Sequence, residues 1–438
     1  MKLDAQTLRL LNWRILPVLF FGQVLLYVDR INVGFAALEM NKELGFTAEI
    51  FGFGAGIFFI GYALFEVPSN LILYKVGAPR WLGRIMVTWG LAAMGMAFVS
   101  GPISFYVLRF LLGVAEAGYG PGLFLFLSAW YPRGYRAAAV GTVLSATPFA
   151  GVIAAPVSTA LLGLEGLGLS GWQWMYIIEG LPALLFGLAF PWLLARGPSK
   201  AAWLPEQSRA AIEDSLAAEK AENALAERSR FAACLMSAPV WLYTLAYFGF
   251  LAGIYSLYFW LPQVVKLAFP QASNLQIGIL SAIPFLIGGL CLVGSGVTSD
   301  RSGDRRWHLV GMGAVAGVGL ILATQLPPLL GFISLCVAVG VGFSYMAVFW
   351  PSPMAALSGT AAAGGLAFIN AVGNLGGFLG PYLFGVIRGY TGSFDTGIAV
   401  FSTFFFLAGL IPLICPSLFS SRQGGATMAE PAPLRMTK

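Results

Sequence analysis

Long apolar stretches follow one another along most of the chain, and each is long enough to cross a lipid bilayer as a helix. A transmembrane helix needs about 20 predominantly apolar residues. Twelve segments have about that length, and a polar stretch at 196–236 separates the sixth from the seventh. The predicted spans are 15–37, 50–74, 82–100, 103–128, 137–163, 173–195, 238–262, 274–298, 308–326, 329–350, 357–387 and 395–418. The pattern therefore predicts an all-α membrane protein with twelve transmembrane helices.

The composition supports this prediction. Of the 438 residues, 58% are hydrophobic and 10% are charged, whereas soluble domains carry about 25% charged residues. The four cysteines lie far apart in or near apolar segments without a CxxC pair, so we interpret them as packing residues. The polar N-terminus shows no cleavable-signal pattern.

The basic residues predict the orientation of the chain. With both termini placed in the cytoplasm, 20 of the 25 Lys and Arg residues fall on the cytoplasmic side. Three fall on the opposite side, Lys42, Lys266 and Arg388, and two lie inside spans, Arg30 and Arg109. Cytoplasmic loops are enriched in Lys and Arg, so we expect cytoplasmic termini. The net charge of +6 then reflects topology and does not call for a nucleic-acid partner.

The two halves of the chain resemble each other. Residues 66–81 align with residues 292–307 at an offset of 226, with Val, Ser, Gly, Arg and Trp in register. A duplicated six-helix unit places a binding site near the midplane, between the halves. The predicted domains are an N-terminal bundle at 1–195, a cytoplasmic connector at 196–236, a C-terminal bundle at 237–421 and a polar cytoplasmic tail at 422–438.

The loop GVTSDRSGDRR at 296–306 resembles the loop signature of the major facilitator superfamily. This resemblance implies two pseudo-symmetric six-helix bundles and a loop that latches helices during the transport cycle. In the first-half copy, Tyr74 replaces the acidic residue, so the latch is better supported in the second half. The implied latch residues are Asp300, Arg301, Gly303, Arg305 and Arg306.

Six charged residues lie inside predicted spans, all in the first half: Asp29, Arg30, Glu66, Arg109, Glu116 and Glu179. A charge at a helix centre costs about 2.5–3.5 kcal/mol on insertion scales, so such residues usually face a cavity and pair. Arg109 and Glu116 are seven residues apart and should share a helix face. We expect Glu66 and Glu179, near helix ends, to be structural.

Two interpretations of the remaining charges stay open. Asp29, Arg109 and Glu116 could form a static ion network between helices. Alternatively, Arg30 binds an anion while the carboxylates carry protons, with the charge of Asp29 stabilised by Arg30 until a substrate anion competes for it. The only histidine, His308, lies at a predicted cytoplasmic helix end, so proton coupling falls to Asp29 and Glu116.

Four motifs resemble the anion:cation symporter family within the superfamily: YVDRINVGFA (27–36), RFLLGVAEAGYGPG (109–122), GWQWMYIIEGLPA (171–183) and INAVGNLGGFLGP (369–381). That family includes bacterial tartrate, phthalate, hydroxyphenylacetate and sugar-acid permeases. The resemblance implies proton-driven uptake of organic carboxylates, with Asp29 and Glu116 in proton coupling. The implied substrate-binding residues are Arg30, Arg109, Tyr27, Tyr62, Trp350 and Asn370.

Other functions find less support in the sequence. No HExxH motif or Cys-His arrangement is present, so we expect neither an enzyme nor a bound metal or cofactor. The alternative is a proton-coupled antiporter that exports organic anions or drugs. The fifth span lacks the GPxxGG run typical of drug exporters, which disfavours export. We expect a monomer in the inner membrane of a bacterium, with a small organic anion and protons as its partners.

Overall fold

The computed structural model describes residues 3–225, 237–357 and 359–419. Within these ranges, twelve helical segments are long and apolar enough to cross a membrane, and each overlaps one predicted span. The helices are α1 (Ala5–Glu43), α2 (Ala48–Val76), α3 (Ala78–Gly95), η1 (Met96–Phe98), α4 (Pro102–Glu116), α5 (Tyr119–Ser128), α6 (Arg133–Leu144), α7 (Ala146–Leu161), α8 (Gly171–Leu193), η2 (Pro198–Lys200), α9 (Glu206–Leu225), α11 (Ala238–Ala268), α12 (Asn274–Ser302), α13 (Arg305–Gln325), α14 (Pro328–Phe349), α15 (Pro351–Ala356), α16 (Gly359–Thr391), α17 (Phe394–Ile414) and η3 (Pro416–Leu418). The prediction of an all-α protein with twelve spans is confirmed.

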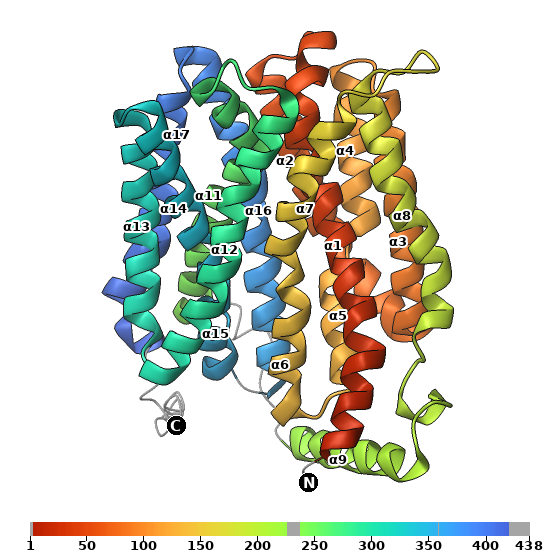
Figure 1. Cartoon of the computed structure of the whole chain (residues 1–438). Coiled ribbons are helices and arrows are strands. Elements are labelled where there is room, and N and C mark those ends of the chain that lie inside the picture. Colours follow the sequence, from red (N-terminus) through yellow and green to blue (C-terminus); the bar gives the residue numbers. More distant parts are fainter. Residues whose placement is uncertain (1–2, 226–236, 358, 420–438) are drawn as a thin grey trace, which may run out of the picture.

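The helices form two bundles that stand side by side, α1–α8 and α11–α17 (Figure 1). The helix α9 lies across one end of the first bundle and supplies the described part of the predicted connector. Residues 226–236 of that connector and the predicted tail at 422–438 lie outside the described residues. The internal repeat is visible in the turns after α2 and α12, where Gly77 (φ 94°) and Gly303 (φ 63°) both adopt positive φ.

Three of the membrane-spanning segments are each built from two α-helices. The fourth breaks between α4 and α5, where Gly118 adopts a left-handed conformation (φ 88°) that favours glycine. The fifth divides at Ser145, and the tenth divides at Trp350, ahead of Pro351. The first of these breaks directly follows Glu116, the last residue of α4.

We call the end of the molecule where α1 begins and α9 lies the terminal face, and the opposite end the far face (Figure 1). Asp4 caps α1 by accepting a hydrogen bond from the Thr7 amide over 2.6 Å, and its bonds with Thr7 lower the pKa of the Asp4 carboxyl. On the terminal face, Glu219 of α9 forms a salt bridge with Arg136 of α6 at 2.9 Å. The connector helix is therefore fastened to the first bundle. The cytoplasmic location of the terminal face stays a prediction.

Between the site described below and the far face, the bundles pack backbone to backbone at glycines of α1 and α2. A Cβ atom on Gly52 would lie 2.5 Å from the carbonyl oxygen of Pro381, and one on Gly56 would lie 2.7 Å from that of Phe378. A Cβ on Gly34 would lie 2.8 Å from the carbonyl oxygen of Phe259. We call these three glycine contacts with α11 and α16 the far-side seal. Larger side chains cannot occupy these positions without separating the bundles.

Candidate functional site

Arg30 lies at the centre of the candidate site and joins the two bundles. Its Nε donates to Glu116 Oε2 of α4 over 2.7 Å, and its Nη1 donates to the Tyr255 hydroxyl of α11 over 3.2 Å. Among the described residues, this is the one salt bridge in which both side chains are less than 10% exposed. Arg30 therefore holds a carboxylate of its own bundle and a hydroxyl of the other bundle at the same time.

Aromatic rings surround the Arg30 guanidinium. Its Cζ lies 5.1 Å from the ring centre of Tyr62, 5.4 Å from that of Phe58 and 5.6 Å from that of Tyr27. Aromatic faces attract a cation, more strongly where water is excluded. The structure thus brings Tyr27 and Tyr62 to Arg30, the grouping that the family resemblance implied.

Glu116 is completely buried, and only one of its oxygens is occupied. Oε2 accepts from Arg30, whereas Oε1 has no hydrogen-bond partner among the described atoms. The chain leaves the helix at the next residue, because Ala117 and Gly118 have non-helical dihedral angles. Broken helices of this kind are typical of transporter binding sites at membrane depth.

Arg109 lies on the same helix as Glu116 and is also buried, but it binds backbone. Its Nη2 donates to the Ala55 carbonyl over 3.0 Å, and its Nε donates to the Gly54 carbonyl over 3.3 Å. Its Cζ lies 5.1 Å from the ring centre of Phe58, which also lies beside Arg30. Arg109 therefore fastens α4 to α2 beside the site, and its contact with substrate stays a prediction.

Asp29 and Arg30 form no salt bridge with each other among the described residues, and the stabilisation of the Asp29 charge by Arg30 stays a prediction. Adjacent residues on a helix point about 100° apart, so the two side chains reach different neighbours. Trp89 Nε1 of α3 donates to Asp29 Oδ2 over 2.9 Å, and Asp29 Oδ1 has no partner among the described atoms. The ion network proposed between Asp29, Arg109 and Glu116 is not formed, since the ion pair of Glu116 is with Arg30.

Glu66 and Asn370 form a second polar contact between the bundles. Asn370 Nδ2 of α16 donates to Glu66 Oε1 of α2 over 2.7 Å, and Glu66 Oε2 has no partner among the described atoms. Asn374 Nδ2 donates to the Asn370 carbonyl over 2.9 Å. Glu66 is therefore buried where the two bundles meet, and its structural role stays a prediction.

Glu179 also differs from its expected place at a helix end. It lies in the third turn of α8, is buried, and accepts a hydrogen bond from Ser158 Oγ over 2.6 Å. Its Oε2 has no partner among the described atoms. The buried carboxylates of the first bundle are therefore four: Asp29, Glu66, Glu116 and Glu179.

Trp350 stands at the junction of α14 and α15, where its half-buried ring meets the Tyr247 ring at 5.0 Å. This places it against α11, the helix that supplies Tyr255. Whether it contacts substrate stays a prediction.

The predicted latch forms the turn between α12 and α13 on the terminal face. Arg305 Nη2 lies 3.1 Å from Asp300 Oδ1, Gly303 supplies the left-handed turn, and Arg301 is exposed beside them. Arg306 Nη2 donates to the Leu413 carbonyl of α17 over 3.2 Å. The loop thus ties α12, α13 and α17 together within the second bundle. The single histidine, His308, sits at this turn and not at the site.

Tyr255 is the functional candidate that the sequence analysis missed. It lies on α11 with Tyr247 and Tyr258, at spacings of eight and three that place the three tyrosines toward one side of the helix. That spacing was the available signal. It was weak because tyrosines also pack in apolar cores without a functional role.

Two bundles with a buried, charged site between them define the architecture of a secondary transporter. The family model of the Major Facilitator Superfamily matches residues 19–381, so the chain belongs to that superfamily. Over 411 residues the chain is 44% identical to a "Putative tartrate transporter" of Agrobacterium vitis, covering 93% of this chain and 90% of the relative. It is 40% identical over 414 residues to a "Quinolone resistance transporter" of Acinetobacter baumannii, covering 94% of this chain and 95% of the relative.

The fold also matches solved structures. The xylose transporter XylE of E. coli, in a partially occluded inward open conformation, superposes with a TM-score of 0.74 at 16% identity, covering 95% of this chain and 99% of that chain. The predicted superfamily fold and the resemblance to tartrate-type permeases are confirmed. The protein is a multi-pass membrane transporter.

Proposed function

We propose that the protein takes up a small organic carboxylate together with protons, as a symporter in the bacterial inner membrane. The observation that carries this proposal is the buried pair of Arg30 and Glu116, with Tyr255 of the other bundle on the same guanidinium. A guanidinium binds a carboxylate through two parallel hydrogen bonds. An incoming substrate carboxylate can therefore replace Glu116 on Arg30.

This replacement couples substrate binding to protonation. Once substrate occupies Arg30, Glu116 is a buried carboxylate without its cation, and burying an unpaired charge is costly. Taking up a proton removes that cost. Release of substrate to the other side restores the pair and expels the proton. Substrate and proton therefore move in the same direction.

The other buried carboxylates can support the same cycle. Asp29 has one oxygen without a partner and lies on the same helix as Arg30, which suits it to relay protons. The Glu66–Asn370 bond joins the bundles and must break when they separate on that side. Arg109 adds a fixed positive charge on the helix of Glu116.

Export is the second candidate function, and the relative named for quinolone resistance supports it. An antiporter could use the same pair in the reverse order, with proton binding driving substrate release. The relative named for tartrate supports uptake of a carboxylate. Both mechanisms require Glu116 and differ in the direction of coupling.

Transport by purified protein in liposomes tests the proposal. Radiolabelled tartrate should accumulate above its external concentration under an inward proton gradient, and accumulation should stop when a protonophore collapses the gradient. Expulsion of preloaded tartrate under the same gradient would support the antiporter instead. A parallel screen of sugar acids and aromatic acids identifies the preferred carboxylate.

A further inference from the structure

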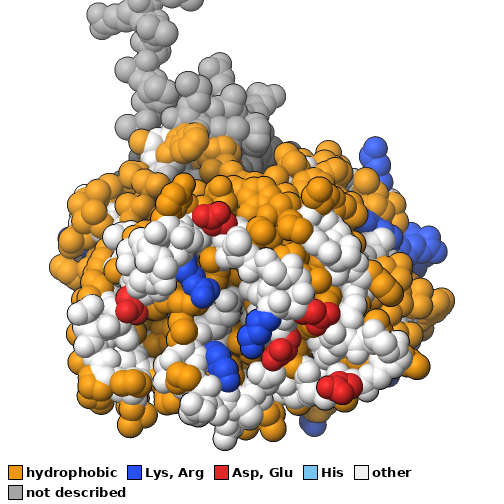
Figure 2. Space-filling view, turned by 90° about the horizontal axis from the view of Figure 1, so that it is seen from above, with side chains coloured by type: hydrophobic (Ala, Val, Ile, Leu, Met, Phe, Trp, Pro, Cys, Tyr) orange, Lys and Arg blue, Asp and Glu red, His pale blue; other side chains and the backbone are white. Residues whose placement is uncertain are grey.

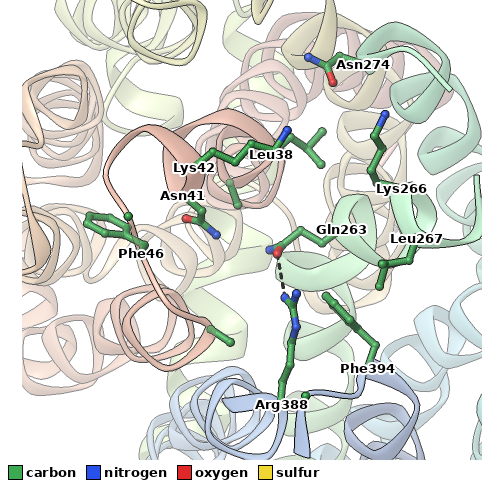
Figure 3. A pocket seen from close by; sticks show the side chains of 14 residues that line it. Leu38, Asn41, Lys42, Phe46, Gln263, Lys266, Leu267, Asn274, Arg388 and Phe394 are labelled. Carbon is green, nitrogen blue, oxygen red and sulfur yellow. Dashed lines mark hydrogen bonds between the residues drawn. The ribbon is translucent and has the colours of Figure 1, made fainter. Parts of the chain in front are cut away.

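A cavity of about 680 Å³ opens on the far face between the two bundles. It is lined by the end of α1 and the α1–α2 loop from one bundle, and by α11, α12 and the α16–α17 turn from the other. The three basic residues of this face, Lys42, Lys266 and Arg388, all line it (Figure 3). One cation comes from the first bundle and two come from the second.

No carboxylate of the described residues forms a salt bridge with these cations. The far-face segments carry five acidic residues, Glu39, Glu43, Glu49, Glu165 and Asp395, and none lines the cavity. Figure 2 shows basic side chains near the centre of this face, with acidic side chains both beside them and toward the edge. Positive charge is therefore gathered at the cavity on a face that carries more acids than bases.

The cavity also holds polar groups positioned for a ligand. Arg388 Nη1 donates to Gln263 Oε1 over 3.4 Å, and the guanidinium lies 3.5 Å from the ring centre of Phe394. The Gln263 amide nitrogen is buried and has no partner among the described atoms. Lys266 Nζ donates to the Ala272 carbonyl, and Lys42 forms no salt bridge in the described part of the chain. The cavity thus offers hydrogen-bond donors that an anion could accept.

The cavity lies immediately outside the far-side seal. Ala48 lines the cavity one helical turn before Gly52, and the Arg388 guanidinium lies 5.7 Å from the ring centre of Trp260. The Phe51 ring packs on the same Trp260 at 4.9 Å. Separating the bundles here would move Lys42 away from Lys266 and Arg388 and open a route from the cavity toward Arg30.

We propose that this cavity is an outer anion-binding vestibule, which concentrates small carboxylates at the closed seal before the bundles open. The identity of the anion rests on the proposed function, whereas the positive potential does not. Charged clefts raise the local concentration and the association rate of ions of opposite charge by about tenfold or more, and salt weakens this effect.

Charged thiol reagents test the vestibule without any transport. In a background without the four native cysteines, Leu267→Cys places a thiol on the cavity lining, where Leu267 is 53% exposed. Leu164→Cys is the matched control, because Leu164 is 40% exposed on the far face outside the cavity. Each variant is treated with an anionic and a cationic methanethiosulfonate reagent at low and high salt.

The anionic reagent should react faster at Leu267→Cys, with an anionic-to-cationic rate ratio about tenfold above that at Leu164→Cys. The ratio should fall in high salt and in the triple variant Lys42→Gln, Lys266→Gln, Arg388→Gln. Equal ratios at the two positions, or a ratio at Leu267→Cys that the triple variant leaves unchanged, would overturn the vestibule. An unchanged thermal-unfolding profile shows that the triple variant is folded.

Measurements of substrate uptake then test whether the vestibule delivers substrate to the site at Arg30. At substrate concentrations well below KM, the triple variant should transport severalfold more slowly and lose its salt dependence, while its maximal rate stays the same. A control that removes three exposed charges from the terminal face, Arg9→Gln, Arg133→Gln and Lys200→Gln, should keep the wild-type salt dependence. Wild-type uptake by the triple variant at low substrate would overturn the delivery role. If the protein transported no carboxylate, the proposed function would fail but the labelling ratios would persist. Failure of the vestibule would instead abolish those ratios, so the two failures are distinguishable.

Discussion

Arg30 Nε and Glu116 Oε2 lie 2.7 Å apart, in side chains that are at most 9% exposed. Removing one partner of a buried pair leaves an uncompensated charge and costs about 3–5 kcal/mol. This cost is not incurred by Arg30 if a substrate carboxylate binds it in place of Glu116. It is not incurred by Glu116 if its carboxylate takes up a proton. In the proposed symport, the pair would therefore open readily when substrate and proton arrive together.

Replacing Arg30 with lysine should weaken substrate binding at least tenfold while the protein stays folded. Lysine keeps the charge but cannot present the planar fork that grips a carboxylate through two bonds. Calorimetric titration of purified protein measures the affinity, and thermal unfolding monitors the fold. An affinity equal to that of the wild type would remove Arg30 from the binding site.

Replacing Glu116 with glutamine should preserve substrate binding and exchange but abolish accumulation driven by a proton gradient. Glutamine resembles the protonated carboxyl and cannot release a proton. Counterflow and gradient-driven uptake in liposomes separate these two activities. We expect Asp29→Asn to lose accumulation as well. If both variants concentrated substrate as well as the wild type, the buried charges would be structural.

Tyr255→Phe should raise KM by about tenfold or more, since it removes one hydrogen bond to a charged group, worth about 1.5–3 kcal/mol. Tyr258→Phe is the matched control on the same helix, because the Tyr258 hydroxyl forms no hydrogen bond with the described residues. Equal effects of the two substitutions would show that Tyr255 contributes through packing alone.

Most of the fold could be predicted from the sequence because bilayer thickness imposes a length on each apolar segment. The breaks within helices could not be predicted from the sequence. The break at Gly118, for example, depends on the left-handed dihedral angle of that residue and on packing against Ser69. Hydropathy carries no information on such contacts. The paired turns at Gly77 and Gly303 were predictable because both halves repeat the same motif.

The site was only partly predictable, because a residue's partner depends on tertiary contacts. Buried charges identified Arg30 and Glu116 through their desolvation cost, but not the bond between them. One of the two interpretations of the sequence placed Arg109 and Asp29 in one ion network. In the structure, Arg109 donates to backbone carbonyls and Asp29 accepts from Trp89. Tyr255 was missed because its role arises only where the two bundles meet.

The orientation of the chain can be tested by cysteine labelling of intact cells. In a cysteine-free background, an impermeant reagent should label Lys42→Cys, which lies on the far face. The same reagent should not label a cysteine at position 215, in the connector helix α9 of the terminal face. We expect this pattern because the terminal face carries the excess of basic residues, and Lys and Arg are enriched in cytoplasmic loops. The reverse labelling pattern would invert the topology.

Closing of the far-side seal should depend on the small size of its glycines. Gly52→Val would place atoms within 2.5 Å of the Pro381 carbonyl oxygen, and overpacking of this kind costs about 1–3 kcal/mol. That cost should shift the equilibrium about ten- to a hundredfold toward a state open on the far side. Labelling of Ala55→Cys, which is fully buried in the seal, should accelerate accordingly, and transport should slow because the bundles cannot close. Gly294→Val is the control, since nothing lies within 4 Å of a Cβ at that position. Slow labelling of Ala55→Cys in both variants would show that the seal tolerates a larger side chain, and the glycines would then serve only to assemble the helices.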